Sequence, residues 1–196
     1  MLTLAILLLA GVAFSGCQQQ SASPSEPSPR IIVGNSVASD FNVLAETTWA
    51  EFLTVFQARR GCIGDVRLEA AHSLDSRAAY DPETATVTVR VPGTPAMLKS
   101  ALVHEWAHHV EFQCDEHRGM RPVFLAAQGL DPDTPWRPGT ALTTAEDHLW
   151  QEMPSELYAE AAIVAVLGRR PIPTLARVKA AAVDVVKAWA EGGTQP

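Results

Sequence analysis

The stretch TPAMLKSALVHEWAHHVEFQ, Thr94–Gln113, decides the expected fold. Thr94 followed by Pro95 is a typical helix start, with threonine as the N-cap and proline at the first helical position. In the predicted helix, Pro95–Gln113, apolar side chains recur on most faces, which indicates a helix buried at the centre of a domain. Its segment HEWAH, His104–His108, places two histidines and a glutamate in this apolar surface. Burying these groups without partners costs several kcal/mol, so we expect a site here.

HEWAH matches the pattern H-E-x-x-H, with His104 and His108 as the two histidines. Residues i and i+4 of a helix lie one above the other on the same face, so both imidazoles can reach one zinc ion. Glu105 is rotated from the first histidine by about 100° and can act on water that the ion activates without being a ligand. The alternative is that both histidines are satisfied core or surface side chains. The apolar surroundings favour a metal as their common partner.

A catalytic zinc ion usually has three protein ligands, so a third ligand is needed. In the metzincin pattern H-E-x-x-H-x-x-G-x-x-H, this chain has Glu111 in place of the glycine and Cys114 in place of the third histidine. Without the glycine the helix continues and carries Cys114 about 9 Å along its axis from His108, too far to bind the same ion. His109 and His117 also lie off the ligand face. We expect His109 to be exposed or to support a ligand.

The segment PSELYAEAAIVAVLG, Pro154–Gly168, predicts a second helix that carries Glu156 and Glu160. The two glutamates are four residues apart, so both carboxylates project from the same face. One can bind zinc while the other accepts the ring N–H of a ligand histidine. The alternative is a pair of surface glutamates. The alanines and aliphatic residues around them argue against it, because small side chains let this helix pack closely on the first.

Taken together, HEWAH and the downstream ELYAE resemble the gluzincin group of zincin metallopeptidases, in particular small ones and the lethal-factor type. The resemblance covers roughly residues 84–168. It implies a Zn²⁺ site in which His104, His108 and Glu156 are the ligands. It also implies that Glu105 is the general base and that the Glu160 carboxylate supports a ligand histidine. It also implies an α+β, zincin-like fold, with a small, mostly antiparallel sheet packed on the central HEWAH helix and further helices toward the C-terminus.

The segment TATVTVRVP, Thr84–Pro92, alternates valine with polar residues and predicts a strand with one buried face, exposed or at a sheet edge. In zincins such a strand lies along the cleft and pairs with the extended substrate. Many of these enzymes also place a tyrosine or histidine where it stabilises the oxyanion of the transition state. Here His148 is the nearest titratable candidate, and Tyr80 and Tyr158 are alternatives.

Hydrophobic periodicity and turn residues predict the remaining elements. Two further strands are expected at Ile31–Ser36 and Asp65–Ala71, and the other helices at Ser39–Gly61, around Arg121–Gly129, at Thr143–Glu152 and at Thr174–Gly192.

The first residues form an apolar run, Leu2–Phe14, that ends in Ser-Gly-Cys. The run is shorter than the roughly 20 residues of a membrane-spanning helix and is typical of an export signal. AFSGC resembles a bacterial lipobox. The resemblance implies a lipoprotein signal peptide at residues 1–16 and lipid on Cys17, which anchors the protein on the extracytoplasmic side of a bacterial membrane. An ordinary cleaved signal peptide or a short membrane anchor are the alternatives. Residues 17–30, rich in serine, proline and glutamine, predict a disordered tether, and residues 31–196 a single domain.

Charge and cysteine content narrow the class further. The net charge is −7 and there is no basic stripe, so binding of nucleic acid through its phosphates is not expected. If Cys17 carries lipid, Cys62 and Cys114 are an even pair in an exported protein, and we expect a disulfide. Two buried free thiols are the alternative.

These features predict a lipid-anchored domain on the extracytoplasmic side of a bacterial membrane that hydrolyses peptide bonds in a peptide or protein substrate with zinc. One alternative is a zincin-like scaffold that binds zinc and cleaves nothing. Another is a helical adaptor in which the motif is accidental.

Overall fold

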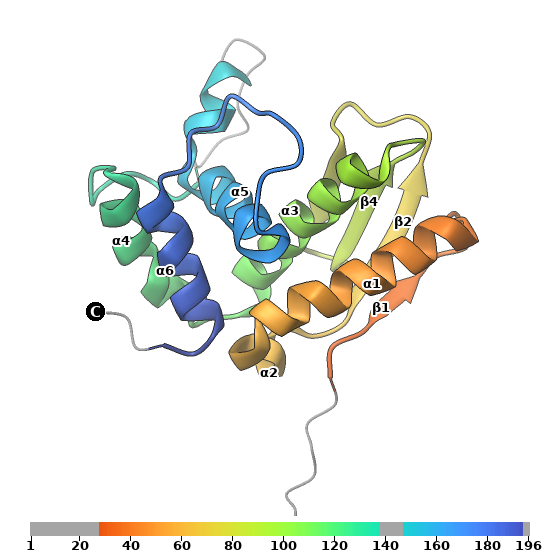
Figure 1. Cartoon of the computed structure of the whole chain (residues 1–196), viewed down its shortest axis with the longest axis horizontal. Helices are drawn as coiled ribbons and strands as arrows, with labels where there is room; N and C mark the ends of the chain where they lie inside the picture. The colour runs from red at the N-terminus through yellow and green to blue at the C-terminus, as the bar shows by residue number, and fades with distance from the viewer. Residues whose placement is uncertain (1–27, 138–146, 194–196) are drawn as a thin grey trace, which may run out of the picture.

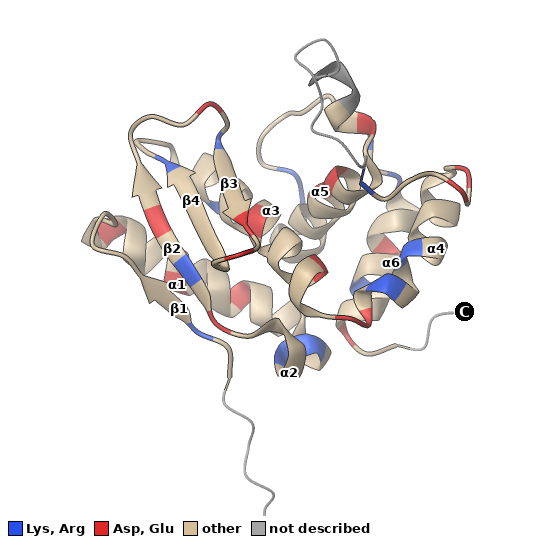
Figure 2. Cartoon of the chain, turned by 180° about the vertical axis from the view of Figure 1, so that it is seen from behind, with Lys and Arg blue, Asp and Glu red and all other residues tan. Residues whose placement is uncertain are grey.

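A small mixed sheet forms one side of the domain, as seen from behind in Figure 2. The computed structural model describes residues 28–137 and 147–193. The sheet order is β1-β2-β4-β3, with the bounds Ile31–Val33, Val66–Ala71, Thr86–Arg90 and Ala78–Asp81, respectively. β1 pairs with β2 and β2 with β4 in parallel, and only the β3–β4 pairing is antiparallel. The expectation of a mostly antiparallel sheet is therefore wrong, because a helical crossover between β1 and β2 makes these neighbours parallel.

The described residues also contain six α-helices and two 3₁₀ helices, which makes the fold mixed α+β. Helix α3 packs between the sheet and α1 on one side and α5 on the other, and α4 and α6 lie beyond α5 (Figure 1). The bounds are α1 Ser39–Val55, η1 Gln57–Arg59, α2 Arg60–Ile63, α3 Pro95–Gln113, α4 His117–Gln128, η2 Asp147–Glu152, α5 Pro154–Leu167 and α6 Ala180–Ala190.

Helix α3 has the bounds that the sequence predicts, and its first turn is capped as expected. The Thr94 side chain accepts a hydrogen bond from the Met97 N–H at 3.3 Å, and Pro95 occupies the first turn. Trp106 and Val110 are fully buried. The helix that carries HEWAH is thus held on several sides by the core, which fixes the direction of its polar side chains.

The strand Thr86–Arg90 is confirmed as β4, but it is not an edge strand. It lies between β2 and β3. The edge strand is β3, which the sequence did not predict. The alternation along β4 correctly indicates one buried face, which carries Val87 and Val89. It does not indicate which strands pair with β4 on either side.

Several helix boundaries differ from the prediction. The helix from Ser39 breaks at Phe56, and the chain turns toward β2 at Gly64, which has a φ of 70°. Helix α4 begins at His117, earlier than expected. Helix α6 begins at Ala180. Of the helix predicted at Thr143–Glu152, residues 147–152 form η2 and the rest lies outside the described residues.

The late start of α6 has a tertiary cause. The Gln128 side-chain amide donates to the Arg177 carbonyl at 2.6 Å and accepts from the Lys179 N–H at 3.0 Å. These two bonds hold residues 177–179 outside the helix, although their sequence pattern is helical.

The disulfide between Cys62 and Cys114 is confirmed, with 5.0 Å between the two Cα atoms. It ties α2 to the residue that ends α3. At the N-terminal boundary, the Pro29 carbonyl accepts the Trp49 ring N–H at 3.1 Å, so the last residues of the predicted tether contact the domain. Within the described ranges, no helix combines the length and apolar content needed to cross a bilayer. Cys17 and the predicted signal peptide lie outside these ranges.

Candidate metal centre

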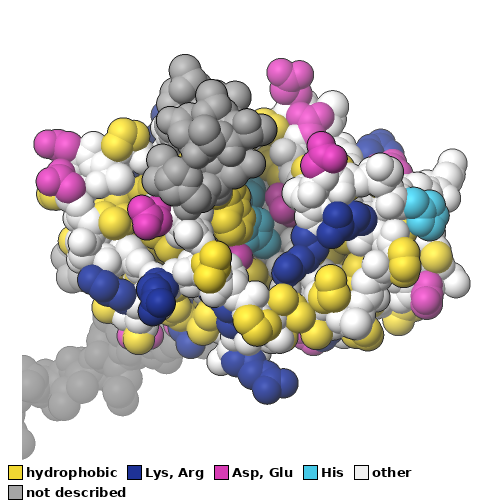
Figure 3. Space-filling view, turned by 90° about the horizontal axis from the view of Figure 1, so that it is seen from above, with side chains coloured by type: hydrophobic (Ala, Val, Ile, Leu, Met, Phe, Trp, Pro, Cys, Tyr) yellow, Lys and Arg dark blue, Asp and Glu magenta, His cyan; other side chains and the backbone are white. Residues whose placement is uncertain are grey.

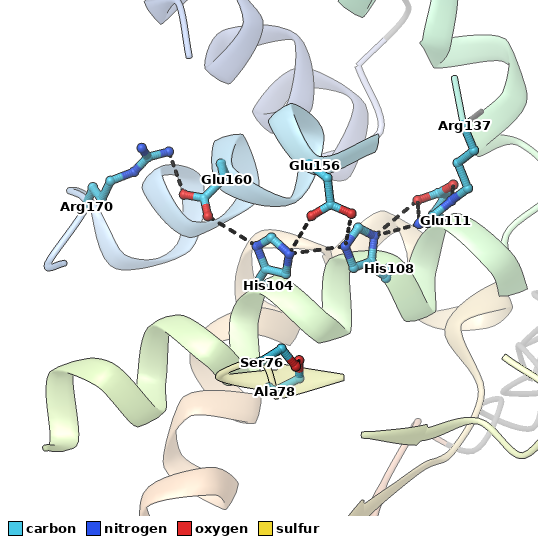
Figure 4. Close-up of polar contacts among 9 residues, drawn as sticks. All are labelled: Ser76, Ala78, His104, His108, Glu111, Arg137, Glu156, Glu160 and Arg170. Atoms are coloured by element: carbon cyan, nitrogen blue, oxygen red, sulfur yellow. Dashed lines mark hydrogen bonds and ion pairs between the residues drawn. The ribbon is translucent and has the colours of Figure 1, made fainter. Parts of the chain in front are cut away.

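Helices α3 and α5 bring His104, His108 and Glu156 together (Figure 4). His104 Nε2 lies 3.0 Å from Glu156 Oε2 and 3.2 Å from His108 Nε2. His108 Nε2 lies 3.4 Å from Glu156 Oε1. All three side chains are nearly buried, and they come from two parts of the chain, His104 and His108 from α3 and Glu156 from α5.

The spacing and chemistry of these atoms suit a zinc ion. Ligand atoms that bind one tetrahedral zinc at about 2.0–2.2 Å stand about 3.3–3.6 Å apart. The two Nε2 atoms are 3.2 Å apart, and each lies 3.0 or 3.4 Å from a different oxygen of Glu156, which is close to this spacing. Two imidazole nitrogens and a carboxylate oxygen are also a common donor set for catalytic zinc. The residues present therefore fit this ion.

Glu160 and Arg170 support His104 from the other side of its ring. Glu160 Oε1 lies 3.3 Å from His104 Nδ1, and Glu160 Oε2 lies 2.6 Å from Arg170 Nη2. When the Nδ1–H group donates a hydrogen bond to Glu160, the ring is neutral and its Nε2 has a lone pair directed at the Glu156 oxygen. Two acceptors at 3.0 Å repel each other unless a cation or a proton lies between them.

A carboxylate and an arginine also lie beside His108, but here both contact the ring. Glu111 Oε2 lies 3.3 Å from His108 Nδ1, and Arg137 binds both oxygens of Glu111 at 2.8 Å. Arg137 Nη2 also lies 2.9 Å from His108 Nδ1, and the Trp136 ring N–H donates to Glu111 at 2.8 Å. Each candidate ligand histidine therefore contacts a buried carboxylate that is itself paired with an arginine.

Sequence reasoning gave Glu111 no supporting role and did not identify either arginine. A signal for Glu111 was present, because it follows His108 by three residues and therefore lies beside it on the helix. Arg137 comes from a proline-rich connection, where no periodicity indicates its direction.

The pKa values show that the centre favours positive charge. Burial lowers the pKa of His104, but its hydrogen bonds with Glu156 and Glu160 outweigh burial and raise it to about 10. Burial also raises the pKa of Glu156, but the two histidines hold it well below its ordinary value. Among the described residues, Glu156 and Glu105 have no arginine or lysine within ion-pair distance, unlike Glu111 and Glu160.

Glu105 is buried and lines the same cavity as the two histidines. Burial raises the pKa of its carboxyl, and the charges of His104 and His108 oppose this shift. A carboxyl whose pKa is raised holds and releases a proton closer to neutral pH, which suits a general base.

The centre opens into a cavity of about 610 Å³. Histidine side chains lie at the bottom of a hollow in Figure 3. The sheet edge, α3, α5 and the segment after α5 form its walls, with lining residues that include Ser76, Ala78, Tyr80, Phe112, Trp150 and Ile172. A ligand can therefore reach the candidate metal position.

The other histidines and tyrosines occupy different places. His109 is fully buried, and its Nδ1 is 2.9 Å from the Tyr80 hydroxyl, so the expectation of an exposed position is wrong. Tyr158 is fully buried beside His117, and neither lines the cavity. The side chain of His148, the predicted oxyanion stabiliser, lies outside the described part.

No protein-family model matches this sequence, and comparisons with curated proteins and with solved structures give no match either.

Proposed function

We propose that this protein is a zinc-dependent peptidase of the gluzincin type, anchored by lipid on the extracytoplasmic side of a bacterial membrane. The observation that carries the proposal is the convergence of His104, His108 and Glu156 at one point beside Glu105, in a cavity open to solvent. The zincin-like assignment of the fold is part of the same proposal.

His104, His108 and Glu156 would hold the ion, and Glu105 would move the proton. Bound zinc polarises a carbonyl and makes water a better nucleophile near neutral pH. Glu105 would take a proton from the attacking water on its carboxylate and later give it to the leaving amine. The buried position of Glu105 supports this role, because its raised pKa lets one group accept and return the same proton.

The edge of β3 is suited to bind the backbone of an extended peptide. Arg77 and Arg90 form a hydrogen-bonded pair, with Arg90 N–H donating to the Arg77 carbonyl at 3.0 Å. In an antiparallel ladder the next residue points its backbone groups to the other side. Ala78 and Tyr80 therefore direct theirs away from β4, and both residues line the cavity. The Ala78 carbonyl accepts a hydrogen bond from the Ser76 hydroxyl at 2.5 Å, so Tyr80 offers the backbone groups for pairing. We assign the substrate-pairing role expected of the alternating strand to β3.

The proposed location rests on the lipobox-like segment before Cys17 and gains support from the disulfide. Structural disulfides are common in exported proteins and rare in the cytoplasm.

The test uses Glu105→Gln, with the exposed Glu51→Gln as a matched control. We expect one bound zinc per wild-type chain by elemental analysis, and hydrolysis of an unstructured protein that stops on chelation. Glu105→Gln should retain zinc and lose activity by about 10²–10⁴-fold. Full activity in Glu105→Gln would contradict the mechanism, and wild-type protein without zinc would leave the adaptor hypothesis standing.

A catalytically silent zinc scaffold is the second candidate, and one observation favours it. The Tyr80 hydroxyl contacts His109, and the Gln113 amide approaches its oxygen at 3.5 Å, so this tyrosine already has partners other than a substrate. A zinc-loaded chain that cleaves no member of a diverse peptide library would support the scaffold.

A further inference from the structure

The cavity extends past the candidate ligands toward the N-terminal end of α3. Glu156 contacts both histidines, whereas Glu160, one turn later on α5, contacts His104. Ile163 follows by three residues, so it lies beyond His104, on the side where α3 carries Ala101. We name this part of the cavity the His104 end.

The lining of the His104 end is mainly apolar. Its apolar members are Ala101, Trp150, Ile163, Ile172 and Pro173. Among the charged residues that line the cavity, Arg170 and Glu160 are 2.6 Å apart and offset each other, and Arg77 is exposed to solvent. A charged side chain buried beside Arg170 and Glu160 would lose water and meet two charges that are already paired, whereas an apolar side chain would be stabilised by burial.

The wall of the His104 end is fixed before any ligand arrives. Arg170 Nη1 donates to the Ala176 carbonyl at 2.9 Å, which closes the segment that carries Ile172. The same guanidinium binds Glu160, which contacts His104. The wall and the candidate metal centre are therefore held by one side chain, and a preformed wall reduces the ordering that binding requires.

A second observation indicates that a ligand enters here. The Ser100 hydroxyl is buried, lines the cavity and has no hydrogen-bond partner among the described residues. At the mouth, Trp150 stacks against His104 at 5.9 Å and remains 37% exposed, and Leu175, next to the lining residue Thr174, is 79% exposed.

From these observations we propose that the His104 end binds a large apolar side chain of the peptide substrate, with Ile172 as a specificity-determining residue. The proposal rests on the peptidase function above. The occupant belongs to an extended peptide because the edge of β3, where Tyr80 directs its backbone groups away from β4, borders the same cavity. Leucine, isoleucine, methionine and phenylalanine are the side chains expected close to the cleaved bond.

The experiment compares the wild-type chain with Ile172→Lys, and uses Val43→Lys as the matched control. Ile172 is half-buried on a connecting segment, and Val43 is 63% exposed on α1, away from the cavity. A randomised peptide library is digested by each zinc-loaded chain, and the products are sequenced by mass spectrometry. We expect a preference of about tenfold or more for apolar over small residues at one position. Ile172→Lys should abolish this preference and favour aspartate and glutamate, with zinc content unchanged, and Val43→Lys should keep it.

Binding of the same peptides to zinc-loaded Glu105→Gln protein, with and without Ile172→Lys, separates the two proposals. Cleavage whose residue preference Ile172→Lys leaves unchanged would overturn the subsite and leave the peptidase. Selective binding of apolar peptides, reversed by Ile172→Lys but without cleavage by the wild type, would overturn the peptidase and keep the subsite. Absence of both binding and cleavage would overturn both.

Discussion

Loss of the Glu160 carboxylate should weaken zinc binding without removing a ligand. Glu160 contacts His104 Nδ1 at 3.3 Å, and its other oxygen contacts Arg170 at 2.6 Å. Glu160→Gln keeps the shape and an acceptor for the ring N–H, but it replaces a charge-assisted hydrogen bond with a neutral one of about half the strength. Glu160→Ala removes the acceptor as well.

The expected loss follows from what such partners contribute in zinc proteins, about 10–100-fold in affinity. We place Glu160→Gln near the lower figure and Glu160→Ala near the higher, which correspond to about 1.4 and 2.8 kcal/mol. Glu111→Gln should weaken zinc binding through His108 to a similar extent. It should also lower stability more, because Glu111 is bonded to both Trp136 and Arg137.

The assay is competition for zinc against a chromophoric chelator at fixed pH, with the melting temperature of the metal-free protein measured in parallel. Glu51→Gln removes a carboxylate from an exposed ion pair with Lys99, so it should change neither quantity appreciably. Folded Glu160→Gln and Glu160→Ala proteins whose zinc Kd stays within about twofold of the wild type would refute the argument that this carboxylate supports His104.

Three further outcomes are expected. Reduction of the Cys62–Cys114 bond, which closes a loop with a sequence separation of 52, should lower the free energy of unfolding by about 4 kcal/mol. Tm should fall by about 8–16 °C with zinc content unchanged, and an unchanged melting curve would contradict this. Burial lowers the pKa of His117 from 6.5 to about 3, so the unfolded state binds the extra proton between these values and stability falls with falling pH. Denaturant titrations at about pH 7 and about pH 5 should differ by about 2 kcal/mol more in the wild type than in His117→Phe. Ala159 is buried on the α5 face that carries Glu156, so Ala159→Leu should destabilise the fold by about 1–3 kcal/mol through overpacking and also weaken zinc binding. Thermal melting and chelator competition measure the two effects. A zinc affinity equal to that of the wild type would show that this packing does not set the position of Glu156.

The two helices of the centre were predictable because their ends and faces are encoded locally. Thr94 and Pro95 define the start of α3, and Gly168 ends α5 in the left-handed region. The spacing of four between His104 and His108 then fixes their common face. Local periodicity was sufficient to place the candidate ligand residues on their helix faces because each lies inside a long, regular helix.

Other parts depend on contacts between distant segments and could not be obtained this way. Strand β3 has four residues and is defined by its pairing with β4, which alternation within one strand does not specify. The pairing of Glu111 with Arg137 joins a helix to a proline-rich connection 26 positions later. The start of α6 is set by Gln128, on another helix.

The two histidine supports also explain why the candidate ligand atoms converge instead of separating. Without outside partners, each imidazole could turn its Nδ1 or its Nε2 toward Glu156, and only some combinations would leave lone pairs facing one point. Glu160 contacts Nδ1 of His104, and Glu111 and Arg137 contact Nδ1 of His108, so both rings are held with Nε2 inward. Each carboxylate is in turn held by an arginine from outside α3, so the geometry depends on the packing of three separate segments. Conformations in which these segments are apart lack the site, and zinc should therefore bind the folded state selectively and stabilise it.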